Sequence, residues 1–408
     1  MFTNQTNVTK NSKPKKLLFG LVVILILIIS VFGYIYYFKN SVSAPSDDKK
    51  SVSKSTYNNN IKFIATGDMI PHDAINQEAK QPDGSYNYTP MFGDMSTLFE
   101  KSDLRFCNQA VLGGGTKFGI SGYPKFNSPT EFSRDMAKLG CNLINTGSNH
   151  TNDFDQSVIT SSVEAWQGLP GVYAVAGANK SDSQKQKVNY FEIKGVKFAF
   201  LSYTTYSNEP PINDYSVTMY SDELAKKQLT EAKSNADIVI VSMRWGTEYS
   251  SDANQSQKQL ALKLANFGAD VILGHGSHTL QPVEQINLDD GRKAIVWYSL
   301  GNFLNAQLDP PSLFNGIAVM NIATDSKQIR IEGYLPVYMH YEWTAEQKAK
   351  VDLLARHNFR LYTFDEGQSA LGKSQNNTTF EEQLNRIKTT LNQETEIKIL
   401  TKDQYLQL

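Results

Sequence analysis

The longest apolar segment of the chain is an unbroken run near its N-terminus. Residues 17–38 carry no charged side chain and consist mainly of Leu, Ile, Val, Phe and Tyr. At about 1.5 Å per residue, a helix over this segment spans about 30 Å, the thickness of a bilayer core. The pattern therefore predicts a single transmembrane helix over residues 17–38.

The charges that flank this run predict its orientation. The lysines within residues 10–16 have no acidic neighbour, whereas two of the three lysines that follow the run, Lys49 and Lys50, lie beside Asp47 and Asp48. Because cytoplasmic flanks are enriched in Lys and Arg, residues 1–16 are expected to be cytoplasmic and the main domain extracellular, at the cell membrane. A cleaved signal peptide is the alternative, because Val42-Ser43-Ala44 resembles a cleavage site.

Strand and helix patterns alternate after a polar linker over residues 39–60. The continuous apolar runs 237–242 and 270–273 predict central parallel strands covered on both faces, with a helix over 256–267 between them. The other predicted strands cover residues 61–66, 104–108, 142–146, 190–194 and 196–203, and the other predicted helices cover residues 129–139 and 157–167.

The last third of the chain shows two further patterns. Residues 281–340 predict successive strands, and Thr344-Ala-Glu-Gln347 has the form of a capping box that begins a helix to His357. An amphipathic helix is predicted over residues 380–391. Together these elements predict an α/β sandwich with sheets inside and helices outside, over residues 61–340, followed by a helical C-terminal extension over residues 341–408.

Composition and charge narrow the range of possible functions. The 408 residues include 40 Lys or Arg and 41 Asp or Glu, a balance that argues against a nucleic-acid-binding protein. The total net charge is −1, and the first 38 residues carry +4, so the remainder carries −5. A polyanion would therefore need a local binding site. Two cysteines exclude a disulfide scaffold, and for Cys107 and Cys141 two buried thiols are favoured over a disulfide.

Three short motifs at predicted strand ends could carry chemistry. Asp68 ends the first strand, Asn149 and His150 follow the third, and His275 and His278 follow a buried strand. In open parallel sheets, ligands bind beyond the carboxyl ends of the strands, so these side chains are expected to converge. Two imidazoles three residues apart on a loop suit a metal or phosphate site. Two loop histidines without a ligand role are the alternative.

The chain resembles the CapA family of poly-γ-glutamate capsule-synthesis proteins, a branch of the calcineurin-like metallophosphoesterase superfamily. This resemblance covers roughly residues 61–340 and implies a four-layer α/β sandwich of the metallophosphoesterase type. The motifs that carry it are Gly67-Asp68, Ser148-Asn-His150, Arg244-Trp-Gly-Thr-Glu-Tyr249, Gly274-His-Gly-Ser-His278 with Leu280-Gln-Pro282, and Tyr298-Ser-Leu-Gly-Asn-Phe303.

The resemblance implies a role for each matching residue. Asp68, Asn149, His275 and His278 match metal ligands, and His150 matches the histidine that assists the leaving group. A divalent metal such as Mn, Fe or Zn is the cofactor implied. In an active member of the superfamily, two cations about 4 Å apart would bind the attacking hydroxide.

Three departures from the family pattern argue against two cations. A histidine ligand is replaced in Asp68-Met-Ile70, a carboxylate is replaced by Ala110, and the usual histidine of the His-Trp-Gly motif is replaced by Arg244. A guanidinium forms paired hydrogen bonds with carboxylate or phosphate, so Arg244, with Glu248 and Asn302, is a candidate for substrate binding. The alternative is an ion pair of Arg244 with Glu248 or Asp68.

Three functions agree with the sequence. The first is a membrane-anchored protein in the synthesis or export of an anionic capsule polymer such as poly-γ-glutamate, working with a membrane synthase complex. The second is a metal-dependent phosphoesterase-like hydrolase at the cell surface. The third is a non-catalytic binding or scaffold module. The sequence alone leaves open whether the protein is an enzyme.

Overall fold

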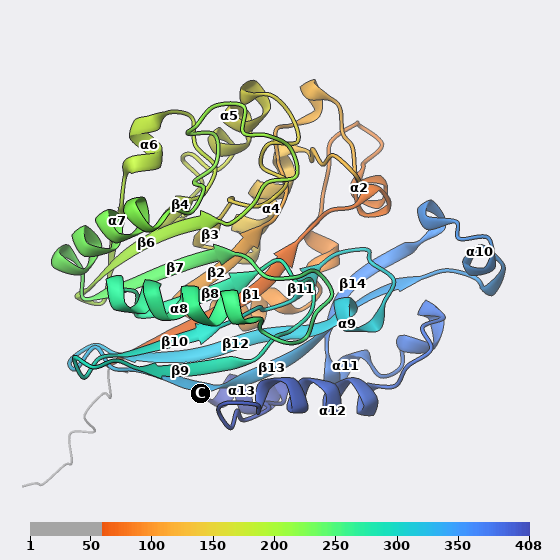
Figure 1. Cartoon of the computed structure of the whole chain (residues 1–408). Coiled ribbons are helices and arrows are strands. Elements are labelled where there is room, and N and C mark those ends of the chain that lie inside the picture. Colours follow the sequence, from red (N-terminus) through yellow and green to blue (C-terminus); the bar gives the residue numbers. More distant parts are fainter. Residues whose placement is uncertain (1–58) are drawn as a thin grey trace, which may run out of the picture. The chain divides into compact units, whose positions relative to one another are not determined.

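The structure of the protein, a computed structural model, describes residues 59–408 (Figure 1). The predicted cytoplasmic segment 1–16, the predicted transmembrane helix 17–38 and nearly all of the linker lie outside the described residues. Within residues 59–408, no helix combines the length and the hydrophobicity needed to cross a bilayer. Asn58–Leu408 form one compact unit, which includes the segment 341–408.

The first sheet combines parallel and antiparallel strands. Its strands are β1 (Asn60–Met69), β2 (Leu104–Gln109), β3 (Leu143–Asn145), β4 (Ala174–Ala176), β11 (Asn302–Leu304), β12 (Phe314–Ala323), β13 (Ile329–Glu342) and β14 (His357–Thr363). The order is β14-β13-β12-β1-β2-β3-β4, and β11 pairs with β1 at its end. Strands β1 to β4 are parallel to one another, so their carboxyl ends meet at one edge.

The second sheet has a parallel centre and antiparallel edges. Its strands are β5 (Asn189–Ile193), β6 (Val196–Thr204), β7 (Ile238–Arg244), β8 (Val271–His275), β9 (Val283–Asn287) and β10 (Lys293–Trp297), in the order β5-β6-β7-β8-β10-β9. Every residue of β7 and β8 is buried, and both strands pair in parallel on each side. The prediction of two central parallel strands is confirmed.

Helices cover the outer faces of the two sheets (Figure 1). The helices are α2 (Asp73–Ala79), α3 (Met95–Glu100), α4 (Thr130–Leu139), α5 (Gln156–Glu164), α6 (Asp182–Gln186), α7 (Asp222–Asn235), α8 (Gln255–Phe267), α9 (Pro310–Leu313), α10 (Ala345–Ala349), α11 (Phe364–Gly367), α12 (Phe380–Leu391) and α13 (Lys402–Gln407).

Three buried clusters define the layers. The inner faces of both sheets share one core, in which Phe106 packs against Phe200. Helices α2, α3 and α4 contribute to the core on the other face of the first sheet, and α7 and α8 to the core on the other face of the second. The predicted α/β class, with sheets inside and helices outside, is confirmed.

The segment after His340 differs in part from its prediction. The capping box at Thr344 is present, but helix α10 ends at Ala349 rather than at His357. Val351 takes a positive φ of 54°, which a helix cannot accommodate, and the chain then forms β14 beside β13. The predicted helix over 380–391 is confirmed as α12, whose Ile387 and Leu391 enter the core between the sheets.

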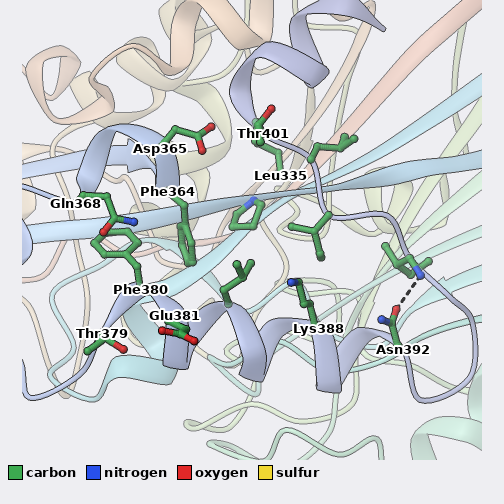
Figure 2. Close-up of a pocket in the computed structure, with 15 residues that line it drawn as sticks. Leu335, Phe364, Asp365, Gln368, Thr379, Phe380, Glu381, Lys388, Asn392 and Thr401 are labelled. Atoms are coloured by element: carbon green, nitrogen blue, oxygen red, sulfur yellow. Dashed lines mark hydrogen bonds between the residues drawn. The ribbon is translucent and has the colours of Figure 1, made fainter.

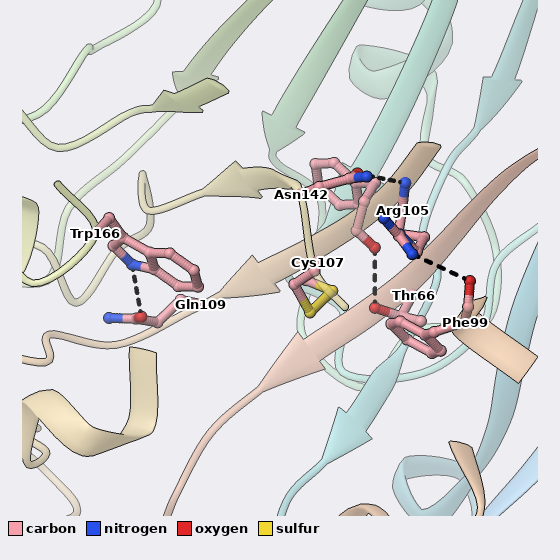
Figure 3. The surroundings of a disulfide bond; sticks show 9 residues. Thr66, Phe99, Arg105, Cys107, Gln109, Asn142 and Trp166 are labelled. Carbon is pink, nitrogen blue, oxygen red and sulfur yellow. Dashed lines mark hydrogen bonds between the residues drawn. A yellow bond between two sulfur atoms is a disulfide. The ribbon is translucent and has the colours of Figure 1, made fainter. Parts of the chain in front are cut away.

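Cys107 and Cys141 form a disulfide between β2 and the residues that precede β3 (Figure 3). The expectation of two buried free thiols is therefore wrong. Both cysteines are buried, as expected, and the two strands are parallel neighbours, so the paired register brings the two side chains together. The spacing of the two cysteines in the sequence does not reveal this register, so the disulfide could not be predicted from it.

We expect the denatured, unreduced chain to show no free thiol, because its two cysteines are bonded to each other. The double variant Cys107→Ala/Cys141→Ala should lose about 2–4 kcal/mol in free energy of unfolding, since the bond closes a loop of 34 residues in the unfolded chain. Thiol labelling and urea unfolding measure these two quantities. Labelling of both cysteines without reductant would contradict the assignment, and Cys141→Ala, which frees one thiol, calibrates the labelling.

Candidate functional site

The predicted site residues meet at the edge where β1, β7 and β8 end. Gly67 lets β1 approach β11 there, because a Cβ atom on Gly67 would lie 2.1 Å from the carbonyl oxygen of Gly301. A continuous set of contacts joins the predicted residues, which we call the strand-end site. Its members are Asp68, Asn149, His150, Arg244, Glu248, His275, His278 and Asn302.

Asp68 is a buried carboxylate at the end of β1. Its Oδ1 accepts a hydrogen bond of 2.7 Å from Asn108, and its Oδ2 lies 3.2 Å from Nδ1 of His278. Oδ1 also lies 3.5 Å from Nδ1 of His275. Burial raises the pKa of this carboxyl, but the two imidazoles outweigh burial and hold the pKa of Asp68 below its ordinary value. Asp68 is therefore ionised at neutral pH.

His278 is held between acceptors on two elements. Its Nδ1 lies 2.9 Å from Oδ1 of Asn302 as well as close to Asp68, and its Nε2 lies 3.9 Å from Oε1 of Glu248. Burial lowers the pKa of this imidazole, but Asp68 and Asn302 raise it by more, so the pKa of His278 lies above its ordinary value. Positive charge on His278 is stabilised in this position.

His275 is fully buried and lacks hydrogen-bond partners. Its ring stacks on Phe106 with a centroid distance of 5.2 Å. Neither ring nitrogen makes a hydrogen bond within residues 59–408. A buried polar atom without a partner is costly, so these two nitrogens mark a place where a ligand or an ordered water would be stabilised.

Arg244 is the last residue of β7, and its guanidinium lies inside the strand-end site. Nε donates to Oδ1 of Asn149 at 2.9 Å, and Nη2 donates to Glu248 at 3.1 Å and to the hydroxyl of Tyr206. The guanidinium also lies 4.5 Å from the centre of the Tyr206 ring. A Cβ atom on Gly276 would lie 2.1 Å from Nη1, and Gly276 has a φ of 109°, so only glycine leaves room for Arg244.

The structure answers the question of which acid pairs with Arg244. The ion pair is formed with Glu248, whose side chain is 41% exposed, and no ion pair joins Arg244 to Asp68 within the described residues. The Arg244 side chain itself is 3% exposed. An exposed carboxylate thus neutralises a buried guanidinium.

His150 forms a pair with an aspartate that the sequence analysis missed. Its Nδ1 lies 2.8 Å from Oδ2 of Asp153, and that oxygen also accepts the backbone N–H of Phe126. The imidazole packs against the Phe126 ring. The signal in the sequence was the spacing of three residues between His150 and Asp153, which one tight turn brings together. The pair orients the imidazole and holds its tautomer.

Other missed residues form a buried polar row across the strand ends. Asn145 donates to Oδ1 of Asn108 at 2.7 Å, and Asn108 donates in turn to Asp68. Ser202, on β6 of the second sheet, donates to Asn145. The row therefore joins the two sheets through side chains that sequence patterns treat as ordinary strand residues.

Positive charge also reaches the rim of the site. Burial and the nearby charge of Arg356 lower the pKa of His72 to about 4. Arg356 is buried and donates to the carbonyl oxygen of Ala306. His72 is therefore neutral at physiological pH.

Two cations do not fit this arrangement. Oδ1 of Asn149, an expected ligand, accepts a hydrogen bond from Arg244, and Ala110 presents a methyl group after β2. Residues 59–408 contain no group of three or more His, Cys, Asp or Glu side chains arranged to hold a metal ion. Asp68, His275 and His278 are residue types that ligate metal ions, but they do not form such a group, and the guanidinium beside them opposes the binding of two divalent cations.

A cavity lies elsewhere in the described part. It has a volume of about 800 Å³ and lies between β13, α11 and α12 (Figure 2). Its lining includes Phe364, Phe380 and Lys388, and none of the eight residues of the strand-end site contributes to it. This cavity is therefore separate from the strand-end site.

Comparisons with known proteins agree with the motifs. A family model described as bacterial capsule synthesis protein PGA_cap matches residues 62–307. The PGA biosynthesis protein CapA of Bacillus subtilis (strain 168) is 33% identical over 172 residues, 41% of this chain and 44% of that protein. The capsule biosynthesis protein CapA of Bacillus anthracis is 31% identical over 185 residues, 43% of this chain and 42% of that protein.

These alignments span less than half the length of the two curated relatives. Among solved structures, the crystal structure of TT1561 of Thermus thermophilus aligns with a TM-score of 0.34 and 10% identity. That alignment covers 66% of this chain and 97% of the other.

We expect Asp68→Asn to lower the free energy of unfolding by about 3 kcal/mol near pH 6 in the presence of a chelator. The loss should be greatest at intermediate pH. Because the pKa of Asp68 is lowered in the folded protein, its contribution to folding stability is lost as pH falls through that pKa. Because the pKa of His278 is raised in the folded protein, its contribution to folding stability is lost as pH rises through that pKa. Urea unfolding at several pH values measures this profile.

Asp182→Asn is the matched control, because Asp182 lies exposed in the first turn of α6. This control should change stability little at any pH. A destabilisation by Asp68→Asn that stays constant from pH 4 to pH 9 would show that the Asp68–His278 pair is not charged as described.

Proposed function

Because the chain belongs to the PGA_cap family of bacterial capsule synthesis proteins, we propose that it acts in the synthesis or export of an anionic capsule polymer such as poly-γ-glutamate. The family membership confirms the resemblance that the motifs indicated. The named relatives act in the biosynthesis of PGA and of capsule, and the residues that match the family model, 62–307, include the whole strand-end site. We further infer that the arrangement of two sheets covered by helices, which makes four layers, is of the metallophosphoesterase type.

The ion pair between Arg244 and Glu248 is the observation that carries this proposal. The guanidinium is buried and positioned by Asn149 and Tyr206, whereas the Glu248 side chain is 41% exposed and accepts hydrogen bonds from Arg244 and Tyr206. Glu248 thus occupies the place that a carboxylate of an anionic polymer would take. Arginine suits this exchange because its planar donors match a carboxylate.

Two neighbours extend the proposed binding surface. Asn302 contacts His278 and Gln307, and the raised pKa of His278 supplies further positive charge beside Arg244. His150, oriented by Asp153, offers a polar ring nitrogen near Asn208. We propose that Arg244 and His278 bind the carboxylates of the polymer, while Asn302 and Glu248 control access to them.

The proposed location is the outer face of the cell membrane. The apolar run 17–38 would anchor the chain with its N-terminus in the cytoplasm, and the linker over residues 39–60 would hold the domain outside. The disulfide between Cys107 and Cys141 supports this location, because disulfides persist in oxidising compartments. A membrane synthase complex is the partner that would deliver the polymer there.

We expect Arg244→Ala in the full chain to weaken binding of poly-γ-glutamate tenfold or more, because it removes a charged hydrogen-bond donor worth about 1.5–3 kcal/mol. Glu248→Ala should bind the polymer at least as tightly as the unaltered chain, since it removes the internal competitor. Arg360→Ala is the control, because Arg360 forms a surface pair with Asp94. Unchanged affinity in Arg244→Ala, measured by titration calorimetry, would exclude this binding role.

A metal-dependent hydrolase is a second candidate function, favoured by the unpartnered nitrogens of His275 beside Asp68. It predicts about one Mn, Fe or Zn per chain after purification, and a phosphoesterase activity that His278→Ala removes. If the strand-end site binds carboxylates without a metal, the purified protein should instead contain less than one metal ion per chain and show no phosphoesterase activity. A chain that binds neither metal nor polymer would leave the third function, a scaffold module.

A further inference from the structure

A groove lined by isoleucine, lysine and arginine side chains lies at the end of the sheets opposite the strand-end site. Its volume is about 630 Å³, within the range of roughly 300–1,000 Å³ that is usual for ligand pockets. Its walls include the first residues of β7, β10 and β13. Arg244 and His275 lie where β7 and β8 end, so the two sites occupy opposite edges of the molecule.

The floor of this groove, which we call the basal groove, is built from isoleucine. Three of these side chains are buried in the core between the two sheets, and the two from β13, Ile329 and Ile331, are partly exposed. Isoleucine offers no hydrogen bond and packs well against alkyl chains. The five floor residues are Ile238, Ile295, Ile329, Ile331 and Ile397.

The rim of the basal groove carries many charged side chains. Five cations and three carboxylates line it, and two further carboxylates, Asp290 and Glu332, pair with rim arginines, so the two signs balance in number. The cations are Lys233, Arg292, Lys293, Lys327 and Arg330, and the carboxylates are Asp237, Asp270 and Glu396.

Two of the rim lysines lack a carboxylate partner in the described part of the chain, and Nζ of Lys327 donates to the carbonyl oxygen of Thr324. Lys233 pairs with Asp270, Arg292 with Asp290 and Arg330 with Glu332. Lys293 and Lys327 form no ion pair within residues 59–408. Lys293 lies at the start of β10, and Lys327 lies in the turn between β12 and β13.

The described chain begins beside this groove. Asn60, the first residue of β1, pairs with Ala323, and the backbone N–H of Thr324 donates to the carbonyl oxygen of Asn59. The turn that follows Thr324 carries Lys327 and forms part of the groove. In Figure 1 the turns β9–β10 and β12–β13 lie together at one end of the sheets. The basal groove is therefore the part of the domain from which the linker leads to residues 17–38.

We propose that the basal groove binds an anionic phospholipid of the bilayer, with the phosphate against Lys293 and Lys327 and the first part of an acyl chain on the isoleucine floor. This inference rests on the proposed function, because it requires the anchor over residues 17–38. A polyanion without an alkyl portion would leave the floor unused, whereas a lipid matches both the charge and the apolar surface. Binding there turns the strand-end site away from the bilayer, toward emerging polymer.

The test uses the full chain in vesicles that contain either a photoactivatable phosphatidylglycerol or the matching phosphatidylcholine. Mass spectrometry then locates the cross-linked residues. We expect phosphatidylglycerol to label residues 291–295 and 326–331, and phosphatidylcholine to label them at least fivefold less. Lys293→Glu/Lys327→Glu should lower the labelling at least fivefold. Lys226→Glu/Lys227→Glu on α7 is the control, which changes the net charge equally and should leave the labelling unchanged.

Several results would overturn this inference. Equal labelling by the two lipids, or labelling that the double variant does not reduce, would show that the groove does not select an anionic lipid. Competition by glycerol phosphate or poly-γ-glutamate as effective as competition by lipid would show that the acyl chain is not recognised. If the chain floats with the vesicles but is not labelled, lipid binding by the basal groove is refuted and the membrane anchor stands. If the chain does not float, the membrane anchor is refuted as well.

Discussion

The burial of the Asp68 charge is the constraint on which the strand-end site depends. An ionised carboxylate in the interior must be compensated, and its partners come from several elements: Asn108 on β2, His275 on β8 and His278 after β8. These elements belong to both sheets. Asp68 can therefore be ionised only where the ends of the two sheets meet in register, and the row from Asn108 to Ser202 fixes that register.

Arg244 gives the same edge a second charge of opposite sign. Its Nε bonds Asn149 and its Nη2 bonds Glu248, so the side chain fills space that the family pattern reserves for metal ligands. A guanidinium and two metal ions cannot share this space, because like charges at short distance repel in a medium of low dielectric constant. The geometry therefore favours recognition of a carboxylate over metal-assisted hydrolysis, and Glu248 shows how such a carboxylate is bound.

Much of this arrangement could be predicted from apolar patterns. Strands β7 and β8 and helix α8 followed from continuous or periodic apolar runs. Five of the eight site residues followed from their positions after strands, and Arg244, Glu248 and Asn302 followed from the motifs that resemble the family. Helix α7 was not predicted, because four of its fourteen residues are buried and its many charges weaken the apolar period. The disulfide, the Asp153 partner of His150 and the contact of Tyr206 with Arg244 depend on tertiary register, which no local pattern records.

The central claim is that the strand-end site binds carboxylates through Arg244 without a metal ion. Titration calorimetry of a γ-linked glutamate oligomer against the full chain, with EDTA and then with excess Mn²⁺, tests it most directly. The account predicts the same affinity under both conditions. Binding that is absent in EDTA and appears only after Mn²⁺ is added would contradict it.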